Sequence, residues 1–196
     1  MFEGLFIVES KNFNFKDEDI KLVELCKNGH KESFEILVKK HQKNVINFAY
    51  RILENFEDAC DIAQEAFFIA YKKIKTFKEE AKFSTWLYKI TLNLSRNQLK
   101  KKKKEKYLES INNQNLSSKT PIPTDEIEKE ELRKKISNCL NLLNEEFKEI
   151  IILRDIEGLS YEEIAYLLKI PEGTVKSRLA RARESFIEKF EKLRRI

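Results

Sequence analysis

The chain has 196 residues, enough for one large or two small domains. Hydrophobic residues make up 41% and charged residues 36%, with only four glycines and three prolines, a balance that favours an all-helical protein over a sheet-rich one. The formal net charge is +5, and basic residues cluster in Lys100–Lys104 and between Lys176 and Arg195, away from the acidic stretch Asp125–Glu131. Separate basic clusters suit a polyanionic ligand, although exposed lysine runs also serve solubility.

The same composition argues against several classes of function. Cys26, Cys60 and Cys139 form no C-x-x-C pair, and the two histidines do not complete a zinc-ligand spacing. The chain shows no nucleophile–base pair and no phosphate-binding glycine loop. It also contains no secretory signal and no apolar stretch of the roughly 18 residues that a membrane span needs. We therefore expect a cytoplasmic protein that is not an enzyme and has no metal, cofactor or small-molecule substrate.

Three helices are predicted in the first third of the chain, after an N-terminal extension over residues 1–16. The first begins near Asp17, with Ile20, Val23 and Leu25 as apolar positions, and ends at Gly29. The second covers 31–53, and the third covers 56–74.

The third helix carries a polar strip beside its apolar face. Asn55 is the expected N-cap of this helix. Asp61, Gln64 and Glu65 are three and four positions apart, so they lie together on the helix surface. From the residues alone, the strip is either a solvated acidic face or a contact surface for a partner.

A fourth predicted helix begins at the segment FSTWLYKI, with Ser84 as its expected N-cap, and ends in the lysine run. Its spacing predicts a core face made of Phe83, Trp86, Leu87, Ile90 and Leu94. Polar and basic side chains are expected to face outward, namely Lys89, Asn93, Arg96 and Asn97. A helix ending in lysines is consistent with phosphate contacts.

The segment 107–125 is rich in Asn and Ser, contains Pro121 and Pro123, and shows no apolar period. It is predicted to be a flexible linker between a first domain at 17–106 and a second at 126–196. As a coil such a linker spans roughly 25 Å, and fully extended it reaches about 60 Å.

The second domain is predicted to be a four-helix module that ends in a helix-turn-helix. Asn144 is the expected N-cap of its second helix, which Gly158 ends. Ser160 and Glu163 then form the S-x-x-E pattern of a capping box, and Pro171 is expected at the first position of the last helix.

The last helix is predicted to bury one face and to present a basic one. Its buried residues are expected to be Val175, Leu179, Ala182 and Phe186. Ser177 and Arg181 lie opposite that stripe, flanked by Lys176 and Arg178. A helix-turn-helix with such a face is typical of DNA binding, whereas an ordinary helical hairpin would use it only as a solvated surface.

Segments of both predicted domains resemble the extracytoplasmic-function (ECF) sigma factors, alternative sigma subunits of bacterial RNA polymerase in the sigma-70 family. The segments DIAQEAF and FSTWLYKI are similar to the domain of that family that binds core polymerase and the promoter −10 element, called region 2. The segment LRDIEGLSYEEIAYLLKIPEGTVKSRLARARESF is similar to region 4, which binds the −35 element. Both occur in the family's order, with a linker between them.

The resemblance implies specific roles and partners. Asp61, Gln64 and Glu65 match positions that dock on the clamp helices of the polymerase β′ subunit, and the second domain is expected to meet the β flap. The connection Lys75–Phe83 matches the loop that captures an extruded −10 base. Contacts to the −10 strand are expected from Lys82, Lys89, Asn93 and Arg96. Contacts to the −35 element are expected from Thr174, Lys176, Ser177 and Arg181, and phosphate contacts from Arg178 and Arg183. An anti-sigma protein is a further expected partner.

Three functions are thus compared: a sigma factor, an autonomous helix-turn-helix regulator, and a helical interaction protein with charged faces. An autonomous regulator needs no polymerase-docking surface, and such proteins usually bind symmetric half-sites as dimers. It therefore leaves DIAQEAF and FSTWLYKI unexplained. The sequence favours a sigma factor that binds core RNA polymerase and directs initiation through the −10 and −35 elements.

Overall fold

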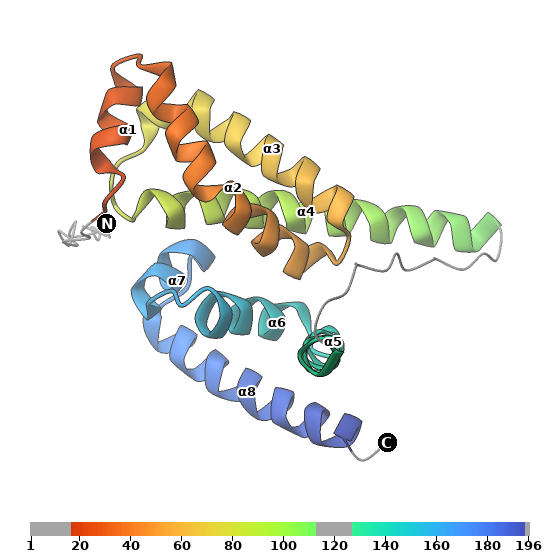
Figure 1. The fold of residues 1–196 in the computed structure, drawn as a ribbon. Coiled ribbons are helices and arrows are strands. Elements are labelled where there is room, and N and C mark those ends of the chain that lie inside the picture. Colours follow the sequence, from red (N-terminus) through yellow and green to blue (C-terminus); the bar gives the residue numbers. More distant parts are fainter. Residues whose placement is uncertain (1–16, 113–126, 195–196) are drawn as a thin grey trace, which may run out of the picture.

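The computed structural model describes residues 17–112 and 127–194, with side chains for 17–105 and 134–193, and within these ranges the chain folds into helices and connecting turns (Figure 1). The N-terminal domain contains α1 (Ile20–Lys27), α2 (Lys31–Leu53), α3 (Phe56–Lys73) and α4 (Phe83–Asn112). The C-terminal domain contains α5 (Ile127–Asn141), α6 (Glu145–Ile151), α7 (Tyr161–Leu168) and α8 (Glu172–Arg194). The all-helical, two-domain prediction is confirmed. The predicted linker, 107–125, begins too early, because residues 107–112 belong to α4. The rest of that linker and the N-terminal extension to residue 16 lie outside the described residues.

The N-terminal domain packs α2, α3 and α4 around large apolar side chains such as Phe48, Phe83 and Leu87, each fully buried. The buried Asp19 carboxylate attaches α1 to α2. Its two oxygens contact Lys40 Nζ and His41 Nε2, each at 2.7 Å. The hydrogen bond to Asp19 raises the pKa of Lys40.

Local capping explains where α3 begins, whereas a distant residue contributes to the start of α4. Asn55 Oδ1 accepts a hydrogen bond from the N–H of Asp58 at 2.9 Å, which confirms the predicted cap of α3. The predicted cap of α4 by Ser84 is wrong, because the helix begins one residue earlier. There the Phe83 N–H donates to Asp17 Oδ2 at 2.7 Å, a contact between residues 66 positions apart.

The connection between α3 and α4 includes η1 (Ile74–Thr76) and is anchored by three aromatic rings. Phe77 packs against both Phe83 and Trp86, with ring centroids 6.2 Å and 5.1 Å away, and the latter two rings also contact each other at 5.9 Å. This cluster holds the buried end of the loop, while Lys78, Glu79 and Glu80 are exposed.

Helix α4 is buried on more than one side. The predicted core residues Phe83 and Leu87 are buried, but Trp86, Ile90 and Leu94 are only half-buried. Several polar or partly polar side chains that alternate with them are buried instead: Thr85, Tyr88, Thr91 and Ser95. Another expectation also fails in this domain, since Leu25 of α1 is exposed.

In the C-terminal domain, two predicted caps are confirmed. Asn144 Oδ1 accepts from the Phe147 N–H at 2.8 Å, and Ser160 and Glu163 form a complete capping box at the start of α7. Between them lies η2 (Ile152–Ile156), a π-helical turn, followed by Gly158 at φ +71°. Pro171 precedes α8 instead of occupying its first position, and its carbonyl accepts from Thr174 and Val175.

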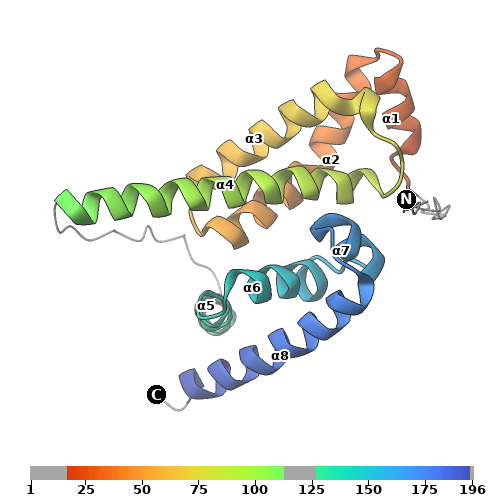
Figure 2. The same ribbon diagram turned by 180° about the vertical axis from the view of Figure 1, so that it is seen from behind.

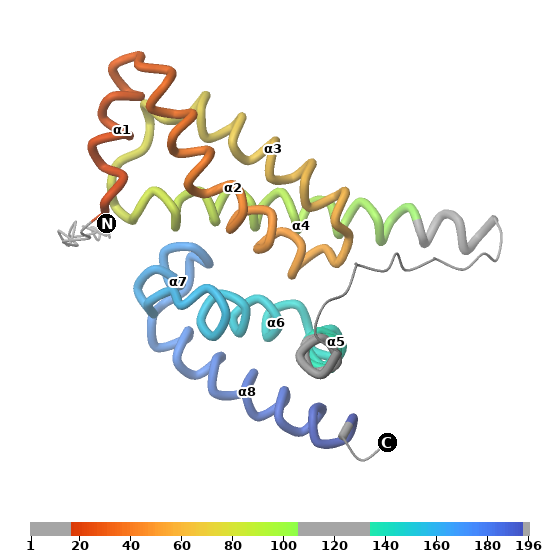
Figure 3. The backbone as a smooth tube through the Cα atoms, viewed as in Figure 1, coloured from red at the N-terminus to blue at the C-terminus, as the bar shows by residue number. Residues whose placement is uncertain are grey.

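The two domains pack together through α4. Both ribbon views place α6 and α7 beside α4, with α8 on the opposite side of the C-terminal domain (Figures 1 and 2), and the backbone trace in Figure 3 shows the same arrangement. A single cluster of buried apolar residues continues from one domain into the other. Among the described helices, none has the length and apolar character needed to cross a membrane.

Candidate nucleic-acid interfaces

Helix α8 buries three of the four residues of the predicted stripe, with Phe186 only half-buried, and it exposes most of the predicted basic face. Val175, Leu179 and Ala182 are at most 2% exposed, whereas Ser177 and Arg181 lie on the surface. The Ser177 hydroxyl donates to the Thr174 carbonyl at 3.2 Å, and Arg181 Nε donates to the Ser177 carbonyl at 3.4 Å. Arg181 forms no ion pair with the described residues, so its guanidinium edge is available to a ligand.

The two cations that flank Ser177 on α8 are paired within the domain. Lys176 Nζ lies 2.8 Å from Glu172, and this hydrogen bond raises the pKa of Lys176. Arg178 lies 3.3 Å from Glu146. Both pairs leave at least one partner accessible to solvent, so each contributes little to stability and can open for a phosphate.

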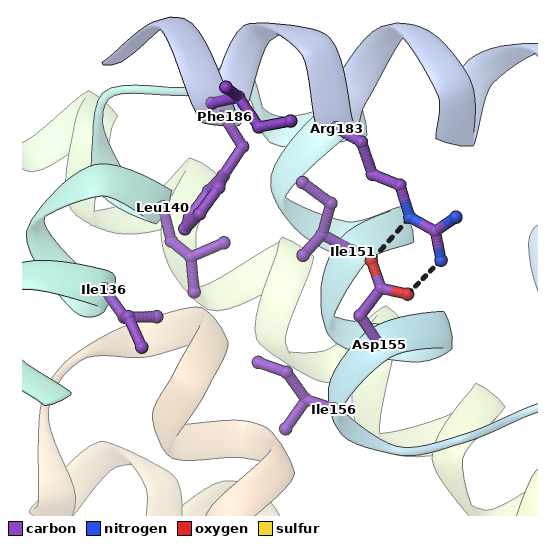
Figure 4. A pocket seen from close by; sticks show the side chains of 8 residues that line it. Ile136, Leu140, Ile151, Asp155, Ile156, Arg183 and Phe186 are labelled. Atoms are coloured by element: carbon purple, nitrogen blue, oxygen red, sulfur yellow. Dashed lines mark hydrogen bonds and ion pairs between the residues drawn. The ribbon is translucent and has the colours of Figure 1, made fainter. Parts of the chain in front are cut away.

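Arg183 points toward Asp155 of η2, away from the exposed Ser177 face. Its guanidinium forms two hydrogen bonds to Asp155, one of them 3.0 Å from Nε to Oδ2, and these raise the pKa of Arg183. The pair lies at the edge of an apolar pocket of about 270 Å³ between α5, η2 and α8 (Figure 4). The pocket is lined mainly by Ile136, Leu140, Ile151, Ile156, Phe186 and Ile187. Sequence periodicity did not indicate this pocket.

The strip on α3 is exposed and unpartnered. Asp61, Gln64 and Glu65 are all on the surface, and none has a hydrogen bond or ion pair with another described side chain. Phe68, one helical turn further along, is 56% exposed, with Lys72 Nζ 4.1 Å from its ring centroid. Exposed acidic side chains beside an exposed aromatic ring favour a protein partner, because aromatic residues are enriched at interfaces.

The face of α4 that carries the predicted −10 contacts lies against the C-terminal domain. Lys82, Lys89 and Arg96 are spaced by seven residues, so they share one side of the helix. Lys82 Nζ is 3.4 Å from Glu163, and Lys89 Nζ is 3.7 Å from the centroid of the Tyr166 ring.

Arg96 forms the most complete of these contacts. It is bidentate to Glu149, with Nε–Oε1 2.7 Å and Nη2–Oε2 2.5 Å. Asn93 is exposed and apart from this set.

These contacts change the titration of the groups involved. Burial lowers the pKa of Lys89, and the charge of Lys169 adds to the effect. Burial also acts on Glu163, but hydrogen bonds from Ser160 and Thr85 outweigh it and hold its pKa below the usual value.

Within the lysine run, Lys102 pairs with Asp58 and Lys103 pairs with Glu145, while Lys100 lies on the surface. The run is therefore partly used in structural contacts. Among the described residues no cluster of His, Cys, Asp and Glu could hold a metal ion. The three cysteines are free, with Cys26 and Cys139 buried and Cys60 half-buried.

Comparisons with known proteins address both domains. Residues 37–105 match the family model described as Sigma-70 region 2, and residues 133–186 match Sigma-70, region 4. The chain is 36% identical over 183 residues to the ECF RNA polymerase sigma-E factor of Haemophilus influenzae, covering 89% of this chain and 96% of the relative. It is 36% identical over 173 residues to the ECF sigma factor SigW of Bacillus subtilis, covering 84% and 92% of the two chains.

This chain belongs to the ECF sigma factors. It is an alternative sigma factor, and its N- and C-terminal domains contain the segments that match sigma regions 2 and 4.

Solved structures share the fold of this sigma factor. CnrH, in a complex with the cytosolic domain of CnrY, is 23% identical with a TM-score of 0.67, covering 88% of this chain and 96% of that chain. The sigma factor RpoE from Bartonella quintana, in a complex with the anti-sigma factor NepR, is 25% identical with the same TM-score, covering 82% and 98%.

Structure adds residues to this sigma factor's surfaces that the sequence did not single out. Phe68 extends the α3 strip. The sequence could have indicated this, because Phe68 follows Glu65 by three positions and therefore lies on the polar side of the helix. Glu149, Glu157 and Tyr166, which meet α4, gave no comparable signal, since an acidic or aromatic residue on an amphipathic helix reads as ordinary surface.

Proposed function

We propose that this sigma factor performs its role through four separate surfaces, two for core polymerase and two for promoter DNA, without catalysing a reaction itself. Polymerase supplies the chemistry of nucleotidyl transfer with its own metal ions. The protein acts in the cytoplasm, where polymerase and promoter meet. The observation that carries the proposal is the α3 strip, an exposed polar surface with no partner among the side chains that the structure describes, on the same domain as the cationic face of α4.

The α3 strip is assigned to the β′ clamp helices. Asp61 and Glu65 present uncompensated carboxylates that would meet basic side chains of a partner, and Gln64 between them can donate and accept hydrogen bonds. Phe68 supplies apolar area at the edge of the same surface.

The −10 element is assigned to α4 and the loop before it. Lys82, Lys89 and Arg96 lie in a row that can follow the phosphates of one strand, and Asn93 adds a side chain that can both donate and accept. The loop around Phe77 would receive an extruded base. Unpairing costs a few kcal/mol per base, and phosphate contacts together with base capture offset that cost.

The −35 element is assigned to the exposed face of α8. Arg181 and Ser177 would face base edges in the major groove, with Thr174 and Lys176 beside them, and Arg178 would contact a phosphate. Arg183 can join these phosphate contacts only if its pair with Asp155 opens.

The pocket at Phe186 is assigned to the polymerase β flap. It is an apolar hollow in the C-terminal domain with the exposed Ile187 at its edge, and contiguous exposed apolar surface of this kind marks interaction sites. An anti-sigma protein is a further proposed partner, in line with the complex of RpoE and NepR named above.

Asp61→Lys tests the polymerase assignment. We expect the dissociation constant for purified core polymerase to rise at least about tenfold, equivalent to ~1.4 kcal/mol, because a repulsive charge replaces an attractive one. Glu35→Lys is the matched control, since Glu35 is an exposed carboxylate on α2 with no partner among the described residues. Equal affinity of the Asp61→Lys variant and the wild type would contradict the assignment.

A further inference from the structure

The lysine run at residues 100–104 lies in the C-terminal half of α4, where its five side chains point to all sides of the helix. Three of them are paired with acidic side chains, namely Lys101 with Glu105, Lys102 with Asp58 and Lys103 with Glu145. The other two, Lys100 and Lys104, are exposed, and neither has a hydrogen bond or ion pair with another described side chain. The run therefore contains two lysines whose charge is not used within the described residues.

Lys100 and Lys104 continue a polar stripe that begins at Asn93. Asn93, Asn97, Lys100 and Lys104 follow one another at spacings of four, three and four residues, so they share one side of α4, and all four are exposed. At 1.5 Å per residue the stripe is about 16 Å long. This half of α4 projects past α2 and α3 (Figure 1), which leaves room for a large partner. We call Asn97, Lys100 and Lys104 the distal stripe.

The distal stripe does not stabilise the helix that carries it. Lys100 and Lys104 are four positions apart, and like charges at that spacing repel and weaken a helix. Cations are favourable in the last turn of a helix, but α4 continues to Asn112, two turns beyond Lys104. A bound polyanion would relieve the repulsion, so the placement of the two charges favours such a ligand.

The chemistry of the distal stripe fits phosphates and not bases. Single-stranded nucleic acid is usually bound on aromatic rings, and the segment 96–105 contains none. The aromatic cluster of Phe77 and Trp86 lies at the opposite end of α4, and Lys104 is 21 residues, or about 31 Å, from Phe83 where the helix begins. Lysine binds phosphate as a point charge, and an asparagine amide can donate to a phosphate oxygen. These contacts are suited to the backbone of a duplex.

We propose that the distal stripe binds backbone phosphates of the promoter duplex between the −10 and −35 elements. This rests on the proposed assignment of α4 to the −10 element. The chain leaves this end of α4 toward the domain that is assigned to the −35 element, so the duplex that joins the two elements lies on this side. The contacts read no base sequence. They add affinity and fix the direction in which the duplex leaves the −10 surface.

The test uses the holoenzyme formed by the full-length chain and core polymerase. Lys100→Gln with Lys104→Gln removes both charges and keeps good helix formers in place. The matched control is Lys39→Gln with Lys43→Gln, two exposed lysines at the same spacing on α2 with no partner among the described side chains. Fluorescence anisotropy gives the affinity for a fluorescein-labelled promoter duplex, selected by run-off transcription, over a series of KCl concentrations. A single-stranded oligonucleotide that carries only the −10 element of that promoter is the second probe.

We expect the distal-stripe variant to bind the duplex more weakly and with a shallower salt dependence. The slope of log affinity against log salt should fall in magnitude by about 1.8, because each phosphate contact contributes about 0.9. The control should keep the wild-type slope, and both variants should bind the single-stranded probe like the wild type. A changed spacer sequence of the same length should leave these differences unaltered.

A structural role of the two lysines is excluded by a separate measurement. Because the variant removes a like-charge repulsion, its urea unfolding, followed by Trp86 fluorescence, should show a stability equal to or above that of the wild type. Weaker duplex binding together with a clear loss of stability would contradict the proposal.

The results that overturn the proposal differ from the one that overturns the proposed function. A wild-type slope for the distal-stripe variant, or an equal change in the control, would show that these lysines make no specific phosphate contact. An equal loss on the single-stranded probe would place them on the −10 strand and not on the duplex. In each case the proposed −10 and −35 surfaces remain. A wild-type holoenzyme that forms no promoter complex would instead remove the proposed function, and this inference with it.

Discussion

The hydrogen bond between Thr85 and Glu163 allows the packing of the two domains to be measured as a free energy. Glu163 uses one carboxylate oxygen, Oε2, to accept from the Ser160 N–H at 2.9 Å within its own domain. The other oxygen, Oε1, accepts from the Thr85 hydroxyl of α4 at 2.9 Å. Thr85 is fully buried, so its hydroxyl has no access to water while the domains are packed.

The expected magnitudes follow from these contacts. Ser160→Ala should cost about 1 kcal/mol, the usual value of a lost N-cap. Glu163→Ala should cost about 2–4 kcal/mol, because it also leaves the buried Thr85 hydroxyl unpaired, a penalty of about 1–3 kcal/mol. Combined with Thr85→Val, which removes the hydroxyl at similar volume, Glu163→Ala should cost only about as much as the lost cap. The cycle therefore predicts a coupling of about 1–2 kcal/mol.

Urea unfolding followed by two probes provides the assay. Far-UV ellipticity reports both domains, whereas fluorescence of Trp86, the single tryptophan, reports the N-terminal domain. Because one apolar cluster joins the domains, Glu163→Ala should shift the Trp86 transition as well. The measured coupling cannot exceed the free energy with which the two domains pack together, because water reaches Thr85 once the domains separate. The packing of α7 on α4 would be refuted by two results together. The costs of Glu163→Ala and Thr85→Val would add within about 0.3–0.5 kcal/mol, as they do for distant sites, and the Trp86 transition would not move.

Three further predictions concern the C-terminal domain. Arg181→Ala should lower promoter-specific initiation roughly 5- to 100-fold, the equivalent of about 1–3 kcal/mol for a base contact. The control Lys192→Ala, on the same helix, should leave initiation near the wild-type level, and both variants should bind core polymerase like the wild type. Equal loss of initiation and of core binding by Arg181→Ala would instead indicate misfolding. Leu179→Ala should destabilise the domain by about 2–4 kcal/mol in urea unfolding, because it opens a cavity in the core. The control Leu142→Ala, at an exposed position, should cost under about 0.5 kcal/mol. Similar costs for the two variants would argue against the described core. Glu163 has a lowered pKa in the folded chain, so its ionised form stabilises the fold above the unfolded value near 4.5, and that contribution is lost as the pH falls through the folded pKa. Glu163→Gln should therefore flatten the fall in stability below about pH 4.5, and an unchanged pH profile would contradict this.

The features that were predictable from the sequence depend on near neighbours. Asn55, Asn144 and Ser160 cap helices through bonds to residues three positions away, so a four-residue pattern is sufficient to identify them. The buried stripe of α8 was predictable for the same reason, because Val175, Leu179 and Ala182 repeat with the helical period.

The features that were not predictable involve distant segments. Ser84 was a reasonable cap by local pattern, but Asp17, 66 residues earlier, provides the acceptor at the start of α4. Thr85 and Ser95 are polar and read as surface, yet both are buried in α4. Lys89 and Arg96 were expected to face outward, but both are half-buried, and no local pattern indicates that Tyr166 and Glu149 lie against them.

The central claim is that this chain confers promoter-specific initiation on core RNA polymerase. Run-off transcription with purified core polymerase and a library of promoter sequences tests it most directly. The account predicts transcripts from a defined subset of promoters only when the chain is added, and a strong loss of those transcripts with Asp61→Lys. A chain that binds duplex DNA by itself but yields no transcripts with core polymerase would contradict the account.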